Sequence, residues 1–284
     1  MQHYVELNTF LDKEVFMMNE KKFKEITKKI AQRYLQRIRE NSLFLEAKLS
    51  KAIVKYVEDD RMPSNGCFSQ EVKANSSDFG IIYFINPNDP ELYIEFITAH
   101  EFAHLVFYNG GISCADICKT DDSFAITYVT RGDETDEYGQ GLEECLADYF
   151  ALHIVKDLHP TLTIEEIAEI IGEVNRETRL ASGTLEITKK IISMFDCESG
   201  GLLADDSFDA VYEDEESRKP KNLLTYEACI GNMSTLIEEY DAIMGKKGWK
   251  ILNKKLDIFL EKSSSRNKNN LEREIKFYFS RKKI

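Results

Sequence analysis

The sequence predicts an α+β protein that is predominantly helical. Apolar residues recur at intervals of three and four over most of the chain, as in amphipathic helices. Two short segments rich in β-branched and aromatic residues, Phe79–Ile85 and Phe124–Val129, are typical of strands. The 284 residues, 43% of them hydrophobic, can bury a substantial core. We predict a helical N-terminal segment (1–60), a core with a small sheet and two helices (61–160), and a helical C-terminal subdomain with a basic tail (161–284).

The amino-acid composition argues against several classes of protein. The net charge of -13 and a pI near 5.0 argue against nucleic-acid binding, which requires clustered basic residues. No stretch is long and apolar enough to span a membrane, and Met1–Glu6 lacks the basic start of a secretory signal, so we expect a cytoplasmic protein. The cysteines are too scattered for a disulfide framework and are predicted to be thiols: Cys67, Cys114, Cys118, Cys145, Cys197 and Cys229.

The segment before the first predicted strand is expected to be helical. From Asn19 to Glu58 the apolar spacing favours one long helix or two, and the turn-rich run Asp59–Gly66 then ends it.

Two further helices are expected in the core. The first runs from Pro90 to Tyr108, with Asp89 as its N-cap, and is apolar nearly all round, as is typical of a buried helix. The second, Leu142 to Leu158, ends before a proline. Later segments with helical spacing are Ile164–Val174, Leu185–Phe195, Leu224–Met244 and Trp249–Leu260, followed by a flexible break at Ser263–Asn267.

A metal-binding motif lies within the first of these helices. His100-Glu101-x-x-His104 places two imidazoles four residues apart, on one helix face, where both can bind one zinc ion. A zinc hydrolase site has three protein ligands and leaves one position for water, so a third ligand is needed.

The second helix offers that third ligand. Glu144 and Asp148 are four residues apart and share a face. We predict that Glu144 binds the metal and that Asp148 accepts a hydrogen bond from the unused ring nitrogen of His100 or His104. Glu143 is a competitor for the ligand role but is rotated away from the face of Asp148.

These residues resemble the gluzincin metallopeptidases, the thermolysin-like group. The resemblance covers about residues 79–158. It implies that His100, His104 and Glu144 hold Zn²⁺, that Glu101 is the catalytic base, and that Asp148 supports a histidine. It also implies a zincin-like core and a zinc-dependent endopeptidase acting on a peptide or protein substrate.

The family's fold also implies a strand that forms one edge of the cleft and pairs with an extended substrate. We expect this strand at Ile81–Ile85 or Phe124–Val129. A tyrosine or histidine that stabilises the transition state is expected as well, and the sequence does not select among its tyrosines: Tyr128, Tyr138, Tyr212 and Tyr226.

Other families fit less well. Metzincins require a glycine and a third histidine where this chain has Phe107 and Gly110, and the aspzincin aspartate is replaced by Thr135. Residues 147–151 are distantly similar to the second helix of ImmA/IrrE-type peptidases, regulatory enzymes that cut repressors. The alternative from another class is a non-catalytic regulatory or binding protein that contains zinc.

Overall fold

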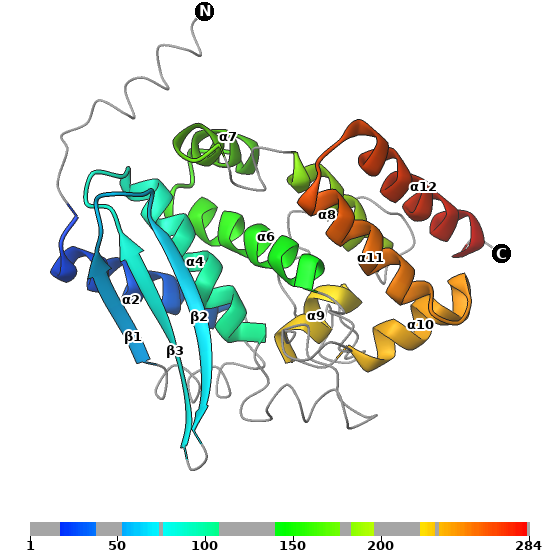
Figure 1. Cartoon of the computed structure of the whole chain (residues 1–284), viewed down its shortest axis with the longest axis horizontal. Helices are drawn as coiled ribbons and strands as arrows, with labels where there is room; N and C mark the ends of the chain where they lie inside the picture. The colour runs from blue at the N-terminus through cyan, green and yellow to red at the C-terminus, as the bar shows by residue number, and fades with distance from the viewer. Residues whose placement is uncertain are drawn as a thin grey trace, which may run out of the picture.

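The predicted fold class, α+β and mainly helical, is confirmed. The computed structural model describes residues 18–37, 53–73, 76–107, 140–176, 183–195, 222–230 and 233–282. Within these ranges a three-stranded sheet lies at one end of the molecule, two long helices cross the middle, and a group of helices forms the other end (Figure 1).

The sheet has the strand order β1-β3-β2. Its strands are β1 (Ile53–Glu58), β2 (Asn65–Lys73) and β3 (Ser76–Ile85). β3 is the central strand, parallel to β1 and antiparallel to β2. The predicted strand at Phe79–Ile85 is therefore confirmed, whereas the one predicted at Phe124–Val129 lies outside the described residues.

The prediction of helix up to Glu58 is wrong. Helix α2 (Glu20–Arg37) is present, but Ile53–Glu58 form a strand. The segment pairs with β3 in a register that places Tyr56 beside Tyr83, and four of its six residues are β-branched or aromatic. Side chains of this kind favour a pleated surface once a partner strand is available, and the helical spacing cannot reveal that partner.

Helix α2 packs between the sheet and helix α4 (Glu91–Phe107). The ring of Phe23 lies 5.3 Å from that of Tyr56 and 5.0 Å from that of Tyr83. Tyr34, also on α2, is fully buried and donates a hydrogen bond to a backbone carbonyl of α4. The aromatic side chains thus fix α4 against the sheet.

Helices α4 and α6 (Gln140–Leu158) form the centre of the molecule and pack against each other along their length. Both were predicted to within two residues at each end. They are buried nearly all round, as their uninterrupted apolar character predicted. Asp89, predicted to cap α4, accepts a hydrogen bond from the backbone N–H of Ser64 at 2.6 Å and so holds the loop before β2.

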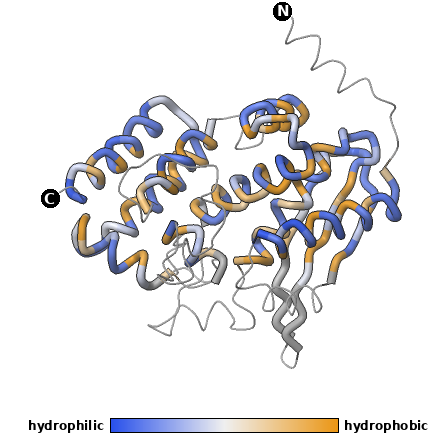
Figure 2. Tube along the Cα trace, turned by 180° about the vertical axis from the view of Figure 1, so that it is seen from behind, coloured by the Kyte–Doolittle hydropathy of each residue, from blue (hydrophilic) through white to orange (hydrophobic). Residues whose placement is uncertain are grey.

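The C-terminal part is helical, as predicted. It contains α7 (Ile164–Val174), α8 (Thr184–Met194), α9 (Leu223–Ile230), α10 (Ser234–Met244), α11 (Gly248–Glu261) and α12 (Ser265–Lys282). Most of the large apolar residues on these helices are buried, and hydrophobic and hydrophilic residues alternate along each helix (Figure 2). An aromatic cluster joins α10, α11 and α12, with Tyr240 stacked on Tyr278 at 5.2 Å and Trp249 edge-on to Tyr240.

Two predictions for this part were wrong. The single helix expected over Leu224–Met244 is divided into α9 and α10, and the Glu227 carboxylate accepts the backbone N–H of Leu236 near the start of α10. The break expected at Ser263–Asn267 is shorter, because α12 begins at Ser265. The supposed basic tail is thus a packed helix, with buried residues at helical spacing: Leu271, Ile275 and Tyr278.

Charged pairs connect the parts of the fold. Arg37 of α2 binds the carboxylate of Asp157 through two nitrogens, at 2.5 and 2.8 Å. His159 pairs through Nε2 with the buried carboxylate of Glu95 on α4. No helix in the described part of the chain is both long and apolar enough to cross a membrane.

The pair of His159 and Glu95 predicts a pH-dependent contribution to stability. The hydrogen bond to Glu95 raises the pKa of His159, although burial opposes it. Because the folded-state pKa lies above the unfolded value of about 6.5, the stabilisation is complete below about pH 6.5 and is lost as pH rises through the folded-state pKa. We expect His159→Gln to lower the free energy of unfolding by about 1 kcal/mol in mild acid and by less in mild alkali.

Urea denaturation of wild type and variant at both pH values measures this difference. Glu95→Gln is the matched control, because it should make the effect of His159→Gln independent of pH. An equal effect of His159→Gln at both pH values in the wild-type background contradicts the prediction.

Candidate metal centre

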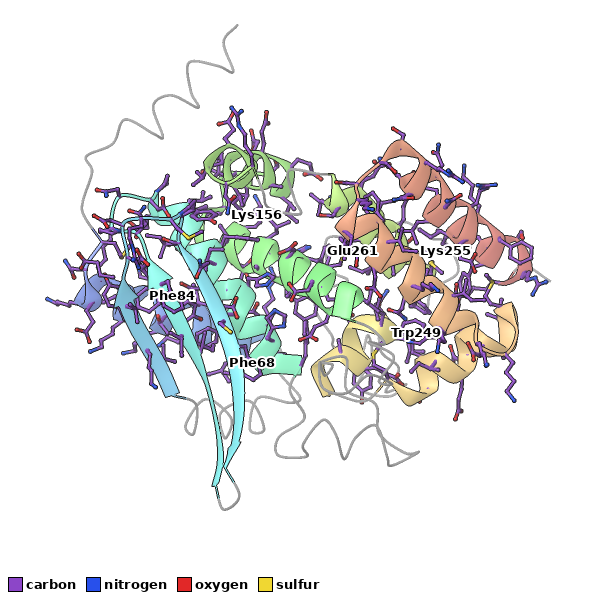
Figure 3. The ribbon with its side chains drawn as sticks, in the orientation of Figure 1. Phe68, Phe84, Lys156, Trp249, Lys255 and Glu261 are labelled. Carbon is purple, nitrogen blue, oxygen red and sulfur yellow. The ribbon has the colours of Figure 1, made fainter. Side chains whose placement is uncertain are left out.

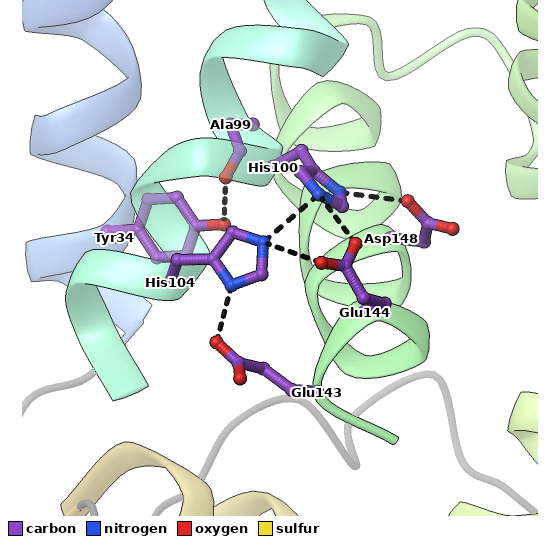
Figure 4. A network of polar contacts seen from close by, with 7 residues as sticks. All are labelled: Tyr34, Ala99, His100, His104, Glu143, Glu144 and Asp148. Atoms are coloured by element: carbon purple, nitrogen blue, oxygen red, sulfur yellow. Dashed lines mark hydrogen bonds and ion pairs between the residues drawn. The ribbon is translucent and has the colours of Figure 1, made fainter. Parts of the chain in front are cut away.

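Helices α4 and α6 bring three of the predicted residues together. His100 and His104 come from successive turns of α4, and Glu144 from the first turns of α6 (Figure 4). The two Nε2 atoms are 3.2 Å apart. The carboxylate oxygens of Glu144 lie 3.4 Å from Nε2 of His100 and 3.7 Å from Nε2 of His104.

These distances fit a zinc ion. Ligand atoms at zinc–nitrogen and zinc–oxygen bond lengths, arranged tetrahedrally, are separated by about 3.3–3.4 Å. The three observed separations, 3.2, 3.4 and 3.7 Å, are close to that value. Two imidazole nitrogens and a carboxylate oxygen are also a common donor set for catalytic zinc. His100, His104 and Glu144 can therefore hold the ion with little rearrangement.

Carboxylates on α6 also face the other ring nitrogen of each histidine. Oδ1 of Asp148 lies 2.8 Å from Nδ1 of His100, an ion-pair distance at which the N–H does not point straight at the oxygen. Oε1 of Glu143 lies 2.5 Å from Nδ1 of His104. Asp148 thus lies where the helical spacing predicts. Glu143 contacts His104 at Nδ1, the ring nitrogen that does not face Glu144. This position of Glu143 was not predicted.

The cluster is buried and rich in negative charge. His100, His104, Glu143 and Asp148 are each less than a tenth exposed. Burial by itself lowers the pKa of His100, but Asp148 and Glu144 outweigh it and raise that pKa to about 10. Burial likewise lowers the pKa of His104, and Glu143 reverses the shift. The carboxylates thus favour positive charge at this point, supplied by protons or by a cation.

Two buried tyrosines bind the turn of α4 just before His100. The hydroxyl of Tyr34 donates to the carbonyl of Ala99 at 2.7 Å, as Figure 4 shows, and that of Tyr83 donates to the carbonyl of Thr98 at 3.1 Å. One comes from α2 and the other from β3. Together these two hydrogen bonds fix the position of α4 along its axis and its rotation about that axis at His100.

Glu101 lies on the side of α4 that faces β2. A Cβ atom on Gly66 would come within 2.3 Å of Cγ and 2.9 Å of Cδ of Glu101, so only glycine leaves room for this side chain. Burial of the neighbouring Cys67 thiol raises its pKa, and the negative charge of Glu101 adds to the shift. The carboxylate of Glu101 is therefore held between α4 and the sheet, and it is less than a tenth exposed.

Comparison with known proteins gives no relative. The chain matches no protein-family model, no curated protein and no solved structure. A function therefore has to be inferred from the cluster itself.

The predicted cleft edge requires a correction. Ile81–Ile85 belong to β3, which is paired on both sides and has no free edge. The strand that contacts α4 with one edge unpaired, among the described residues, is β2, whose Phe68 packs near α4 (Figure 3). Its sequence, with Asn65, Gly66 and several polar residues, gave only a weak strand signal.

The structure describes only some of the other residues that the sequence brings into consideration. Tyr226 lies on α9, which packs against α4. His153, a further histidine, is buried in α6 with its ring 4.4 Å from that of Tyr149. The other candidate tyrosines, Tyr128, Tyr138 and Tyr212, lie outside the described residues, as do Thr135 and the predicted thiols Cys114 and Cys118.

The geometry predicts one zinc ion per chain. Glu144→Ala removes one of the three ligands, and we expect it to abolish zinc retention. Asp148→Asn leaves the ligands in place, and we expect zinc affinity to fall by roughly 10–100-fold. Mass spectrometry of the purified proteins for metal measures retention, and competition with a chelator measures affinity.

Glu173→Ala, which removes an exposed carboxylate on α7, is the control and should bind zinc like wild type. Equal zinc retention by wild type and Glu144→Ala would rule out the predicted ligand set.

The contact between Gly66 and Glu101 predicts strong coupling between the two positions. Gly66→Ala should lower the free energy of unfolding by about 1–3 kcal/mol, because the added methyl group overlaps Glu101. In a Glu101→Ala background the overlap disappears, so we expect most of the loss to disappear as well.

Denaturation of the two single variants and the double variant measures the coupling. Asn65→Ala, an exposed position on the same strand, controls for changes to β2 itself. Additive effects of Gly66→Ala and Glu101→Ala would show that the two residues are not in contact.

Proposed function

We propose that the chain is a zinc-dependent metallopeptidase with a gluzincin-type site in a zincin-like core. The observation that supports this most is the spacing of the two Nε2 atoms and the two carboxylate oxygens of Glu144, at distances of 3.2–3.7 Å, with Glu101 next to His100 on the same helix. Among the described residues, His100, His104 and Glu144 are the three that would hold the ion, and three protein ligands are the number typical of catalytic zinc sites. The proposed cofactor is Zn²⁺.

Each side chain of the cluster has a distinct part in the proposed reaction. Nε2 of His100, Nε2 of His104 and the carboxylate of Glu144 hold the ion, while Asp148 and Glu143 fix the orientation of the two imidazoles. Zinc, when bound, supplies a Lewis acid that activates water and polarises a carbonyl group.

Glu101 acts as the general base. Its carboxylate accepts a proton from the attacking water, and it then passes that proton to the nitrogen of the departing amine. Its position against Gly66, buried between α4 and β2, restricts its rotamers and so holds the carboxylate in one place. Hydrolysis of a peptide bond needs both transfers.

The substrate is proposed to bind along β2. Within the described part of the chain one edge of this strand is unpaired, and the strand contacts α4, so an extended peptide can add to the sheet through backbone hydrogen bonds. Recognition of this kind depends little on the substrate's side chains, and a peptide or protein substrate suits it better than a small amide.

Replacement of the proposed base tests the function directly. Glu101→Gln keeps the shape of the side chain but cannot accept the proton. We expect it to retain zinc and to lose peptidase activity by roughly 10²–10⁴-fold. Cleavage of a mixed peptide library, followed by mass spectrometry, first identifies a substrate for wild type and then gives the rates.

Glu91→Gln, on the exposed first turn of α4, is the matched control and should cleave at the wild-type rate. Zinc-loaded wild type that cleaves no peptide, or Glu101→Gln that cleaves as fast as wild type, would contradict the proposal. The first result would favour a zinc-containing binding protein.

A further inference from the structure

The helical hairpin of α11 and α12 exposes apolar side chains on its outer face. Ile251 and Ile258 of α11 are 48% and 42% exposed, and Phe277 of α12 is 47% exposed. Between the two helices runs a groove of about 800 Å³, lined by residues that include Ile258 and Phe277. These three residues are thus nearly half of the large apolar side chains that are exposed in the described part of the chain: Val54, Val57, Met62, Phe84, Ile251, Ile258 and Phe277.

The cationic side chains in and beside this groove are only partly paired with carboxylates. Nearby lysines have carboxylate partners, in the pairs Lys190–Glu272, Lys268–Glu186 and Lys255–Glu274. Arg273 and Lys276, which line the groove, have none among the described residues, and Arg273 only donates a hydrogen bond to Asn270. Both are exposed. In a chain of net charge -13, this groove therefore combines apolar side chains with uncompensated positive charge.

We propose that the groove between α11 and α12 binds an acidic, amphipathic helix of a partner protein. Ile251 and Ile258 are seven residues apart, which is two helical turns, and they form an apolar ridge on one side of α11 that Lys254 and Lys255 interrupt. A third helix laid along the groove packs its apolar stripe against this ridge and against Phe277. Acidic residues flanking that stripe pair with Arg273 and Lys276.

The length of the surface suits such an occupant. α11 has 14 residues and is therefore about 21 Å long, enough for three to four turns of a bound helix. An isolated anion or a nucleic-acid backbone complements the positive charge but leaves the isoleucine side chains uncovered. Lys255, labelled in Figure 3, is on the groove side of α11 and is already paired with Glu274.

This surface is separate from the metal centre. α12 lies at the end of the molecule opposite the sheet (Figure 1). The proposal is independent of peptidase activity, and changes on the groove should leave zinc content unaltered. Failure of one proposal does not imply failure of the other.

Binding of a synthetic peptide to the full chain tests the proposal. The probe is a fluorescently labelled helix of 14 residues, the length of α11, with leucines at positions three and four apart and glutamates elsewhere. A peptide of the same composition with the leucines dispersed is its control. Fluorescence anisotropy should show that wild type binds the amphipathic peptide at least about tenfold more tightly than the control.

Two double variants separate the contribution of the positive charges to binding from that of the apolar side chains. The double variant Arg273→Glu/Lys276→Glu should bind the glutamate-containing amphipathic peptide about tenfold or more weakly than wild type does. The same variant should bind tightly to a peptide in which lysines replace the glutamates. Ile258→Ser/Phe277→Ser should weaken binding of both peptides. Lys21→Glu/Lys28→Glu, an equal charge change at exposed positions of α2, should bind like wild type.

Three results would overturn the proposal. Equal affinity for the amphipathic and dispersed peptides would show simple charge attraction. Tighter binding of a single-stranded oligonucleotide than of the peptide would assign the groove to nucleic acid. A wild-type dimer in sedimentation that Phe277→Ser dissociates would assign the groove to a second copy of the chain. Circular dichroism and zinc content of every variant confirm that each is folded.

Discussion

The structure depends on the burial of charged groups between α4 and α6. Two imidazoles and the carboxylates of Glu143 and Asp148 are almost excluded from solvent, on helices that are otherwise apolar. Removing one partner from such a group leaves a charge that costs several kcal/mol. The two helices must therefore meet in one register, and the elements around them serve to hold that register.

Support for this register comes from three directions. From one side, Tyr34 of α2 and Tyr83 of β3 bind adjacent carbonyls of α4. From another, the carboxylate of Asp257 on α11 accepts the backbone N–H of Gly141 at 3.1 Å, at the start of α6, where a negative charge stabilises a helix. The third is Gly66 of β2, which leaves space for Glu101. Sheet and C-terminal helices thus position one small cluster.

Local spacing in the sequence was enough to predict α4 and α6 and to place His100 and His104 on one face of α4, because residues four apart on a helix share a face. Glu144 was then chosen because a zinc site needs a third ligand, and the structure brings it to the two histidines. Local spacing failed where the outcome depends on a second element. β1 forms a strand because it pairs with β3, which follows it in the sequence. Glu143 contacts a histidine because Nδ1 of His104, on another helix, points toward its carboxylate. The signal for α12 was present in Leu271, Ile275 and Tyr278 but was read as a tail.

The donors of the cluster are divided between its two helices, with both imidazoles on α4 and the carboxylates that contact them on α6. An unfolded chain keeps the histidines near each other but separates them from Glu144 by about 40 residues, so it binds a divalent ion only weakly. An ion that prefers the native state in this way stabilises it by mass action. The free concentration of that ion would then set the fraction of molecules in which α4 and α6 are docked.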